Sequence, residues 1–195
     1  MKNFETTLPE DYKEIYRIDA TNKKTGLLLN LAGLPLFVIA LIPFLFFVDF
    51  RALAKSSPLI LFFGFWFGTV AYLILHELTH GAAYKIMTKQ KLKFGFSWSC
   101  AFCGIPDAYS YRHTAIISLI APLTLFSIIF IALAIVFHGV NMMLYLLFSL
   151  LFAIHFSGCV GDMYVTLLFL TRFRDKTTLM RDTGPEQTFY QKKGD

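Results

Sequence analysis

Long apolar runs separated by short charged segments are the main pattern of this chain. Each of four runs is long enough to cross about 30 Å of hydrocarbon as a helix. Charged side chains are rare inside the runs and gather before, between and after them. The pattern therefore predicts an all-α integral membrane protein with about four transmembrane helices, at residues 27–50, 58–87, 114–137 and 141–171.

The composition supports a membrane protein rather than a soluble one. Hydrophobic residues make up 56% of the chain, charged residues only 16%, and phenylalanine alone occurs 22 times. A soluble domain of this length could not bury so much apolar surface. We expect a single polytopic membrane domain over residues 1–195, with an N-terminal segment at 1–26, a membrane core at 27–171 and a tail at 172–195.

The distribution of lysine and arginine predicts the orientation in the membrane. Basic residues concentrate in the N-terminal segment, in the connection between the second and third spans, and in the tail, whereas the first outer connection holds only Arg51 and Lys55. Because cytoplasmic loops carry the excess of basic residues, both termini are expected in the cytoplasm of a multi-pass protein of the cell membrane. The net charge of +5 suits a lipid bilayer with anionic headgroups, and no pattern indicates nucleic-acid binding.

The connection at residues 89–112 carries a different pattern from the spans. Apolar and polar side chains alternate there, which favours a strand, and residues 108–111 could return as a second strand after a turn. Such a short cytoplasmic β-hairpin could offer its edge to an extended substrate. An aromatic loop that only anchors the helices at the interface fits the sequence equally well. The candidate substrate-loop residues are Phe94, Phe96 and Trp98.

Two shorter segments give weaker signals. Pro9 can begin a short helix over residues 9–20, either along the cytoplasmic membrane surface or in solvent. Cys100 and Cys103 form a C-x-x-C pair, but no second pair accompanies it, so free thiols are expected in a reducing cytoplasm.

The sequence His76-Glu77-Leu78-Thr79-His80, within the second span, is an H-E-x-x-H zinc motif. On a helix, His76 and His80 lie one above the other, so both imidazoles can reach one ion. Glu77 can then act as general base towards a zinc-activated water molecule. The motif predicts one zinc ion per chain, with one protein ligand still to be found.

Depth in the membrane indicates the missing ligand. Apart from Asp49 at the outer end of the first span, Glu77 and Asp162 are the only acidic residues inside the predicted spans. Asp162 and His80 lie at similar distances from the cytoplasmic ends of their spans, so Asp162 is the expected third ligand. His155, two turns earlier on the same face, is an alternative ligand or a hydrogen-bonded interior histidine. Cys159, between them, is a further candidate.

A zinc motif in one span, completed by an aspartate late in another, resembles the site-2 protease class of intramembrane zinc metalloproteases. More closely, the chain resembles a small bacterial membrane family described as putative zincin peptidases. The resemblance runs from about Tyr12 to the tail and rests on the order of His76–His80, Ala121-Pro122 and Gly161-Asp162. The site-2 class has an Asn in the helix after the zinc motif and an Asp-Gly element, whereas this chain lacks that Asn and has Gly-Asp.

The expected function is that of a membrane-embedded zinc metallopeptidase that hydrolyses peptide bonds within or near the membrane. Its partners would be a membrane protein or peptide substrate and the lipid bilayer. The alternative is a non-proteolytic zinc-binding membrane protein, either a scaffold or a metal transporter that uses the same cluster as an ion path. A transporter usually carries ionisable residues at several depths and an internal repeat, and the sequence has neither. The sequence does not indicate an oligomeric state.

Overall fold

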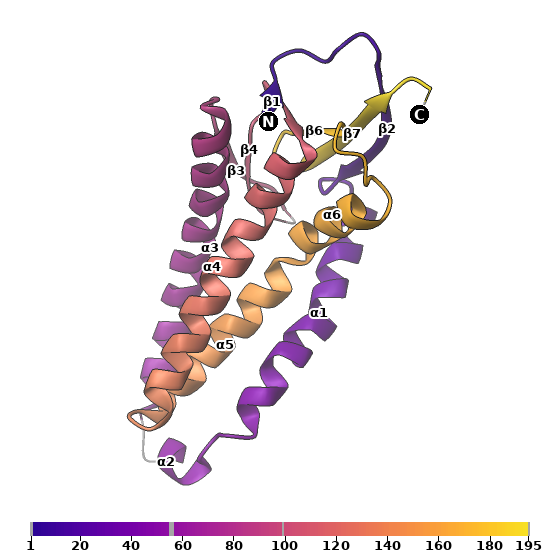
Figure 1. Ribbon diagram of the computed structural model, residues 1–195. Coiled ribbons are helices and arrows are strands. Elements are labelled where there is room, and N and C mark those ends of the chain that lie inside the picture. Colours follow the sequence, from indigo (N-terminus) through magenta and orange to yellow (C-terminus); the bar gives the residue numbers. More distant parts are fainter. Residues whose placement is uncertain (1, 55–56, 99, 195) are drawn as a thin grey trace. The chain divides into compact units, whose positions relative to one another are not determined.

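The computed structural model describes residues 2–54, 57–98 and 100–194. Lys55, one of the basic residues used above to predict the orientation, lies outside the described residues. The helices are α1 (Lys23–Leu45), α2 (Phe50–Ala54), α3 (Pro58–Thr88), α4 (Arg112–His138), α5 (Met142–Gly158) and α6 (Val160–Thr171) (Figure 1). The strands are β1 (Phe4–Glu5), β2 (Tyr12–Asp19), β3 (Lys93–Phe96), β4 (Ala101–Gly104), β5 (Tyr109–Tyr111), β6 (Leu179–Asp182) and β7 (Glu186–Lys192).

Three of the helices, α1, α3 and α4, are long and apolar enough to cross a membrane. The pair α5 and α6 passes the same test when taken as one bent span, which gives up to four spans within the described residues. The expected fourth span is therefore broken. Cys159 separates the two helices, and its backbone N–H bonds back to the carbonyl oxygens of His155 and Ser157. Gly158 and Gly161 flank the break, and glycine is a poor helix former.

Helix α1 starts four residues earlier than the apolar run, and it ends before the predicted boundary at residue 50. Asn22 explains the early start, because its side-chain oxygen accepts a hydrogen bond from the backbone N–H of Lys24 at 3.0 Å. Such a cap satisfies a donor that the first turn of a helix cannot pair itself. Lys23 and Lys24 are therefore drawn into the helix despite their charge.

A five-stranded antiparallel sheet overturns the prediction of an all-α protein. Its strand order is β1-β5-β6-β7-β2, and each neighbouring pair is antiparallel. The tail, expected to be a simple cytoplasmic extension, supplies the two adjacent strands β6 and β7. Strands from both ends of the chain meet here, with Tyr12 opposite Lys192 in the pairing of β2 with β7.

The prediction of a helix at residues 9–20 is also wrong, because this segment forms β2. A β-bulge between Glu14 and Tyr16 shifts the pairing register by one residue. A bulge places two residues of one strand opposite one residue of its partner, so the alternation of inward and outward side chains is interrupted. The resulting spacing of Tyr12, Ile15 and Tyr16 imitates the period of a helix.

The expected strand in the connection at residues 89–112 is present as β3, but its partner differs from the prediction. Residues 101–104 form β4 and pair with β3, with Phe94 opposite Cys103. Residues 109–111, within the segment expected to return, form β5 of the larger sheet instead. The turn at Ile105 is as expected, since the N–H of Ala108 donates to the Ile105 carbonyl oxygen at 3.1 Å.

The chain forms two compact units, to which α1, α3 and α4 each contribute a segment. The first comprises Met1–Asn30, Glu77–Pro122 and Gly161–Asp195, and the second comprises Leu31–His76 and Leu123–Val160. In the first unit, one face of the sheet packs on α4 and α6. The buried side chains of this core are Ile18, Ala115, Leu119, Val165, Phe169, Phe173, Met180 and Phe189.

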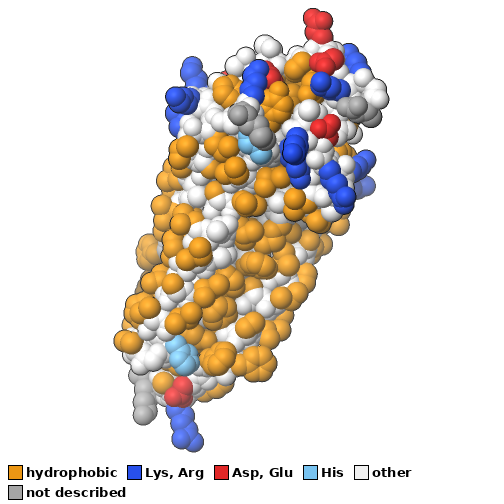
Figure 2. All heavy atoms as spheres, in the orientation of Figure 1, with side chains coloured by type: hydrophobic (Ala, Val, Ile, Leu, Met, Phe, Trp, Pro, Cys, Tyr) orange, Lys and Arg blue, Asp and Glu red, His pale blue; other side chains and the backbone are white. Residues whose placement is uncertain are grey.

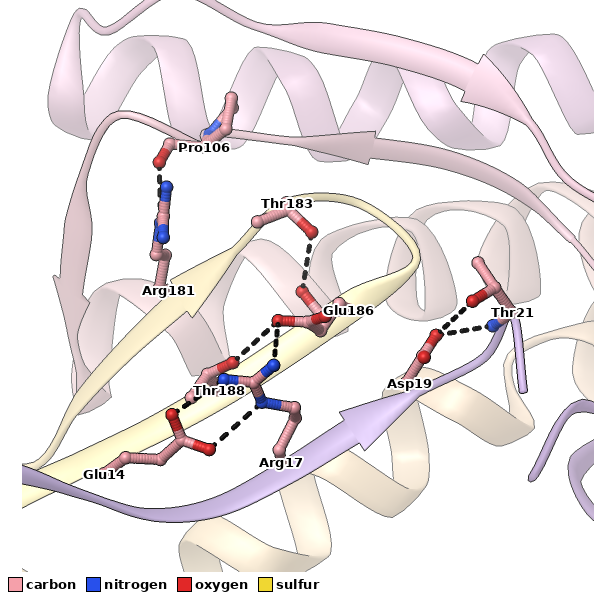
Figure 3. A network of polar contacts seen from close by, with 9 residues as sticks. All are labelled: Glu14, Arg17, Asp19, Thr21, Pro106, Arg181, Thr183, Glu186 and Thr188. Carbon is pink, nitrogen blue, oxygen red and sulfur yellow. Dashed lines mark hydrogen bonds and ion pairs between the residues drawn. The ribbon is translucent and has the colours of Figure 1, made fainter.

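The other face of the sheet carries a polar network (Figure 3). Arg17 donates two hydrogen bonds to the carboxylate of Glu14, at 3.0 and 2.8 Å, and lies 3.5 Å from Glu186. Thr188 donates to the same Glu186 carboxylate. The Arg17 and Glu14 side chains are 50% and 42% exposed, so their ion pair adds little stability, whereas Thr188 is buried. The same face also holds a buried hydrophobic cluster of Tyr12, Leu179 and Tyr190, so both faces of the sheet carry apolar side chains.

The second unit is helical, with an aromatic and aliphatic core. Tyr72, Phe126, Phe130, Leu147 and Leu151 form its buried centre. Its helices also expose large hydrophobic side chains, among them Phe67 at 72% and Leu59 at 61%. Figure 2 shows hydrophobic side chains over most of the visible helical surface, whereas lysine and arginine side chains gather near its ends. An apolar exterior of this kind suits contact with lipid.

Candidate metal centre

A row of buried polar side chains runs along α3. Tyr72, His76, His80, Tyr84 and Thr88 occupy every fourth position, and each is at most 7% exposed. Residues four apart on a helix lie on neighbouring turns, so these side chains form one continuous ridge. Polar groups buried in so apolar a helix need partners. The partners of His80, Tyr84 and His76 define the site.

His80 is held in one tautomer by the backbone of α4. Its Nδ1 lies 2.8 Å from the carbonyl oxygen of Ser118, which can only accept a hydrogen bond. Nδ1 therefore carries a proton, and in the neutral ring Nε2 carries the lone pair. That Nε2 faces the carboxylate of Asp162, 3.4 Å from Oδ2. Both atoms are acceptors when the ring is neutral, so either a proton on Nε2 or a metal ion between them joins the pair.

The separation of these two atoms fits a zinc ion. Tetrahedral zinc with bonds of 2.0–2.2 Å to nitrogen and oxygen holds its ligand atoms about 3.4 Å apart. The observed distance from Nε2 of His80 to Oδ2 of Asp162 is 3.4 Å. A direct hydrogen bond between an imidazolium and a carboxylate is shorter, at about 2.7–2.9 Å. The donor set and its spacing are therefore compatible with zinc.

The break between α5 and α6 determines where Asp162 lies. Asp162 falls in the first turn of α6, which begins at Val160 directly after the break. Carboxylates are favourable at this end of a helix, because the unpaired N–H groups there carry partial positive charge. Its side chain is 19% exposed, compared with 8% for His80. The pair is therefore shielded but not sealed from solvent.

Glu77 lies one turn before Gly81, where the β3–β4 hairpin packs against α3. A Cβ atom at Gly81 would lie 2.8 Å from Cζ of Phe94 and 3.3 Å from Sγ of Cys103. Glycine thus allows the hairpin to approach the helix closely. Since residues 77 and 81 share a face of α3, the hairpin covers the side that carries the Glu77 carboxylate. Glu77 itself is half-buried.

The three candidate substrate-loop residues differ in their surroundings. The Phe94 ring reaches towards Gly81, although 46% of the side chain remains exposed. Phe96 is 78% exposed, and Trp98 is 58% exposed while its indole N–H donates to the Thr21 carbonyl oxygen at 3.1 Å. Phe94 thus contacts the metal-motif helix, whereas Phe96 and Trp98 expose most of their side chains.

The cysteines of the C-x-x-C pair are free thiols, as expected. Burial, together with the nearby carboxylates of Asp182 and Glu77, raises the pKa of Cys103 to about 12. A thiol that stays protonated is a poor nucleophile and a poor metal ligand. Cys103 therefore serves as a packing residue between the hairpin and α3.

His76 belongs to the second unit, where its ring contacts Tyr72 and His155. The Tyr72 hydroxyl oxygen lies 2.9 Å from Nδ1 of His76 and 3.0 Å from Nδ1 of His155. His155 is fully buried, and its other nitrogen, Nε2, lies 3.2 Å from the carbonyl oxygen of Leu123 and 3.1 Å from the Ser127 hydroxyl. Both nitrogens of His155 thus have hydrogen-bond partners.

The second unit also offers a different group of potential metal ligands. His76, His155 and Cys159 each contribute a ligand atom, and these atoms lie within 4.8 Å of one another. Cys159 is fully buried, with Sγ 3.6 Å from Nδ1 of His155. For His155 to bind a metal through this Nδ1, the Tyr72 hydroxyl would have to move away.

Sequence reasoning missed Tyr72, Tyr84 and Asp182. Tyr84 donates a hydrogen bond to Oδ2 of Asp182 at 2.7 Å, and this carboxylate also accepts from the Gly184 N–H at 2.9 Å. The repeat of polar residues every four positions along α3 is a signal that could have found the two tyrosines. No local pattern points to Asp182, because its role depends on pairing between distant strands.

Comparison with known protein families agrees with the chemistry of this centre. A family model described as putative zincin peptidase matches residues 69–177. The chain belongs to this zincin peptidase family. Searches of the curated proteins and of the solved structures found no match.

The part of this zincin peptidase that matches the family includes His76, Glu77, His80, His155 and Asp162. It extends from within α3 to the segment just before β6, so β2, β6 and β7 lie outside it. Membership implies a zinc-dependent peptidase, in agreement with the expectation from the H-E-x-x-H motif. It does not by itself assign individual ligands.

Proposed function

We propose that this zincin peptidase is embedded in the membrane and hydrolyses peptide bonds within or near it, in the manner of site-2 proteases. His76, His80 and Asp162 would hold one zinc ion, and Glu77 would act as general base. The observation that carries the proposal is the pair formed by His80 Nε2 and Asp162 Oδ2, 3.4 Å apart, with Nδ1 of His80 committed to Ser118. With a neutral imidazole, such a pair offers two metal ligands, the lone pair of Nε2 and a carboxylate oxygen.

His76 completes the proposed ligand set through its place on α3. It precedes His80 by four residues on one helix, so the two imidazoles lie on neighbouring turns. Its Nδ1 is hydrogen-bonded to Tyr72, as Nδ1 of His80 is to Ser118. Both histidines would therefore present Nε2, the arrangement found when zinc-binding histidines are oriented by a partner behind them.

His155 fits a supporting role better than a ligand role. Both of its nitrogens are hydrogen-bonded, and it lies fully buried among aromatic side chains. A site made of His76, His155 and Cys159 would also leave Glu77 without a function. We therefore keep Asp162 as the third ligand and leave Cys159 as a packing residue.

The residues of the site divide the chemistry between them. Zinc, when bound, would polarise the scissile carbonyl and lower the pKa of a water molecule towards 7. Glu77 would accept the proton of the attacking water on its carboxylate and return it to the leaving amine nitrogen. His76 and His80 keep their Nδ1 protons in hydrogen bonds to Tyr72 and Ser118, so they stay oriented throughout.

The β3–β4 hairpin supplies a place for the substrate backbone. Among the described strands, β3 pairs with β4 alone, so its outer edge can accept another strand. Phe94 packs the hairpin on α3 beside Gly81, one turn from Glu77. A peptide added to this edge would be extended, which exposes its scissile bond. Phe96 and Trp98 would contact the substrate or the membrane interface. The basic residues of the connection, such as Lys91, favour the cytoplasmic side.

The test uses Glu77→Gln beside the wild type and the control Glu10→Gln. Glu10 is exposed, lies outside α3 and carries no proposed role. Each protein is purified, its zinc content is measured, and cleavage of a library of transmembrane peptides in vesicles is followed by mass spectrometry. We expect Glu77→Gln to keep zinc and lose cleavage, with the control unchanged. Cleavage by Glu77→Gln at the wild-type rate would refute the assigned mechanism.

A wild type that binds zinc but cuts none of the peptides would refute the peptidase assignment and favour a zinc-binding scaffold or transporter. Transport can be checked with the same vesicles, since zinc uptake is measurable with an enclosed fluorescent chelator. Uptake that depends on Asp162 would identify the transporter.

A further inference from the structure

Tyr72 places a single hydroxyl group between two histidine rings inside an apolar core. Its ring packs in T-shaped contacts with Phe126 and Phe130, at centroid distances of 5.4 and 5.7 Å. The side chain is 3% exposed, so the hydroxyl group must find partners within the protein. It lies 2.9 Å from Nδ1 of His76 and 3.0 Å from Nδ1 of His155.

A backbone carbonyl sets the direction of these hydrogen bonds. Nε2 of His155 lies 3.2 Å from the Leu123 carbonyl oxygen, an obligate acceptor, so Nε2 carries a proton. A charged imidazolium is costly in this fully buried, aromatic surrounding, so the ring is neutral and its Nδ1 is an acceptor. The Tyr72 hydroxyl donates to that Nδ1. The tyrosine oxygen then accepts, and the donor is Nδ1–H of His76.

Cys159 is the competing donor to His155, and it is the weaker one. Its Sγ lies 3.6 Å from Nδ1 of His155, compared with 3.0 Å for the tyrosine oxygen. A thiol is a weak donor, whereas a phenol O–H is a good one. With the Leu123 carbonyl oxygen as acceptor, and the Ser127 hydroxyl at 3.1 Å able to accept from the same Nε2–H, the hydrogen bonds run from His76 through Tyr72 and His155 to Leu123.

We propose that Tyr72 and His155 are positioning residues that lock His76 in the tautomer with its proton on Nδ1, and thereby keep Nε2 as the metal-binding nitrogen. The proposal rests on the proposed zinc site. The partner of a zinc-binding histidine is commonly a carboxylate, a carbonyl oxygen or water. Here a carbonyl oxygen fixes the tautomer of His76 indirectly, through hydrogen bonds of His155 and Tyr72. Tyr72 and His155 are 83 residues apart in the sequence. An uncharged relay avoids placing another carboxylate in the apolar core.

The first variant to test is Tyr72→Phe, with Tyr145→Phe as its matched control. Both tyrosines are 3% exposed and lie in the second unit, but the Tyr145 hydroxyl donates to the Phe44 carbonyl oxygen, and its ring contacts His138, which has no proposed metal role. Zinc affinity is measured by competition with a chelator. Removing such a partner typically costs 10–100-fold in metal affinity. We expect this loss in Tyr72→Phe and none in the control.

Two substitutions of His155 separate positioning from direct ligation. Glutamine retains one acceptor for Tyr72 and one donor for Leu123, so His155→Gln should preserve most of the affinity. His155→Leu removes both and should resemble Tyr72→Phe. If His155 were itself a zinc ligand, glutamine and leucine would lower affinity alike while Tyr72→Phe would leave it unchanged. That result would overturn the relay and leave a zinc peptidase with a different ligand set.

The tautomer itself is visible by nitrogen NMR of zinc-free protein labelled with ¹⁵N-histidine. The chain has five histidines, and the signal missing from His76→Gln identifies His76. We expect Nδ1–H in the wild type and in Tyr145→Phe, and loss of this single form in Tyr72→Phe. An unchanged His76 tautomer in Tyr72→Phe would overturn the proposal. Because this readout needs no zinc, it judges the relay even if the wild type binds no zinc and the proposed function fails.

Discussion

The hydroxyl group of Tyr84 donates a hydrogen bond of 2.7 Å to the carboxylate of Asp182, and so ties α3 to the strand β6 that follows all the helices in the chain. Asp182 is 3% exposed and also accepts from the N–H of Gly184 in the turn after β6. The connection lies one helical turn beyond His80. The sheet therefore supports the same helix that carries the metal motif.

Asp182 should make the stability of the protein depend on pH. Burial raises the pKa of this carboxyl group from 3.8 to about 6, against the lowering effect of its hydrogen bonds from Tyr84 and Gly184. The folded state then binds a proton more tightly than the unfolded state. Its contribution to stability is complete below pH 4 and is lost as the pH rises through about 6. The loss is on the order of 2–3 kcal/mol.

The measurement is thermal unfolding in detergent between pH 4 and pH 8, for the wild type and for Asp182→Asn. Asparagine has no proton to lose, so the unfolding temperature of the wild type relative to that of Asp182→Asn should fall as the pH rises through 6 and level off above it. All other titratable groups are the same in both proteins, so the comparison removes their effect. A difference that does not vary with pH would show that Asp182 is ionised throughout.

Asp162→Ala should remove most of the zinc from the purified protein. The substitution deletes a proposed ligand, so its effect should exceed the 10–100-fold loss of affinity typical for a group behind a ligand. Zinc content is measured by elemental analysis. The control is Asp11→Ala, an exposed carboxylate 4.0 Å from Lys192 on the sheet. Full zinc content in Asp162→Ala would remove this residue from the ligand set.

Cys159→Ala should retain zinc, because the proposed site does not use the thiol. The fully buried side chain loses only one sulfur atom, which leaves a small cavity and costs roughly 1 kcal/mol of stability. Zinc content and unfolding temperature are measured on the same preparation. Loss of zinc in a protein that remains folded would instead support the group formed by His76, His155 and Cys159.

Gly81→Ala should loosen the hairpin from α3 without removing a metal ligand. The added methyl group would lie 2.8 Å from the tip of Phe94, 3.1 Å from Leu92 and 3.3 Å from Cys103. Overpacking of this kind typically costs about 1–3 kcal/mol. Peptide cleavage should fall while zinc content stays high. Gly139→Ala is the control, since nothing lies within 4 Å of a Cβ atom there. Equal cleavage by both variants would argue against a role of the hairpin in binding substrate.

The helices could be predicted from the sequence because length and apolarity alone define a membrane-crossing segment. Depth matching placed Asp162 at the level of His80, and the two side chains do lie 3.4 Å apart. The depth match agrees with this distance because a helix converts residue number into distance at a fixed rate, and the ligand role of Asp162 stays a prediction. It needed no knowledge of how the helices pack.

The sheet could not be predicted because β1, β5 and β6 have only two to four residues each and its pairings connect distant segments. The bulge at Glu14–Tyr16 interrupts the alternating pattern by which β2 could be recognised, and β5 has only three residues. The relay from Tyr72 to His155 joins residues 83 positions apart, and the bond from Tyr84 to Asp182 joins residues 98 positions apart. Contacts of this kind depend on the complete fold, so no local sequence pattern predicts them.

The pairing of β2 with β7 has a consequence for how the protein is made. Synthesis proceeds from the N-terminus, so the ribosome produces β2 and every helix before β7, the strand with which β2 pairs. Until Glu186–Lys192 emerges, β2 has no partner in the sheet, and Asp182 is likewise made only after α3. The metal-motif helix thus gains its support from the sheet late in synthesis, which would delay the activity of a protease until its chain can fold completely.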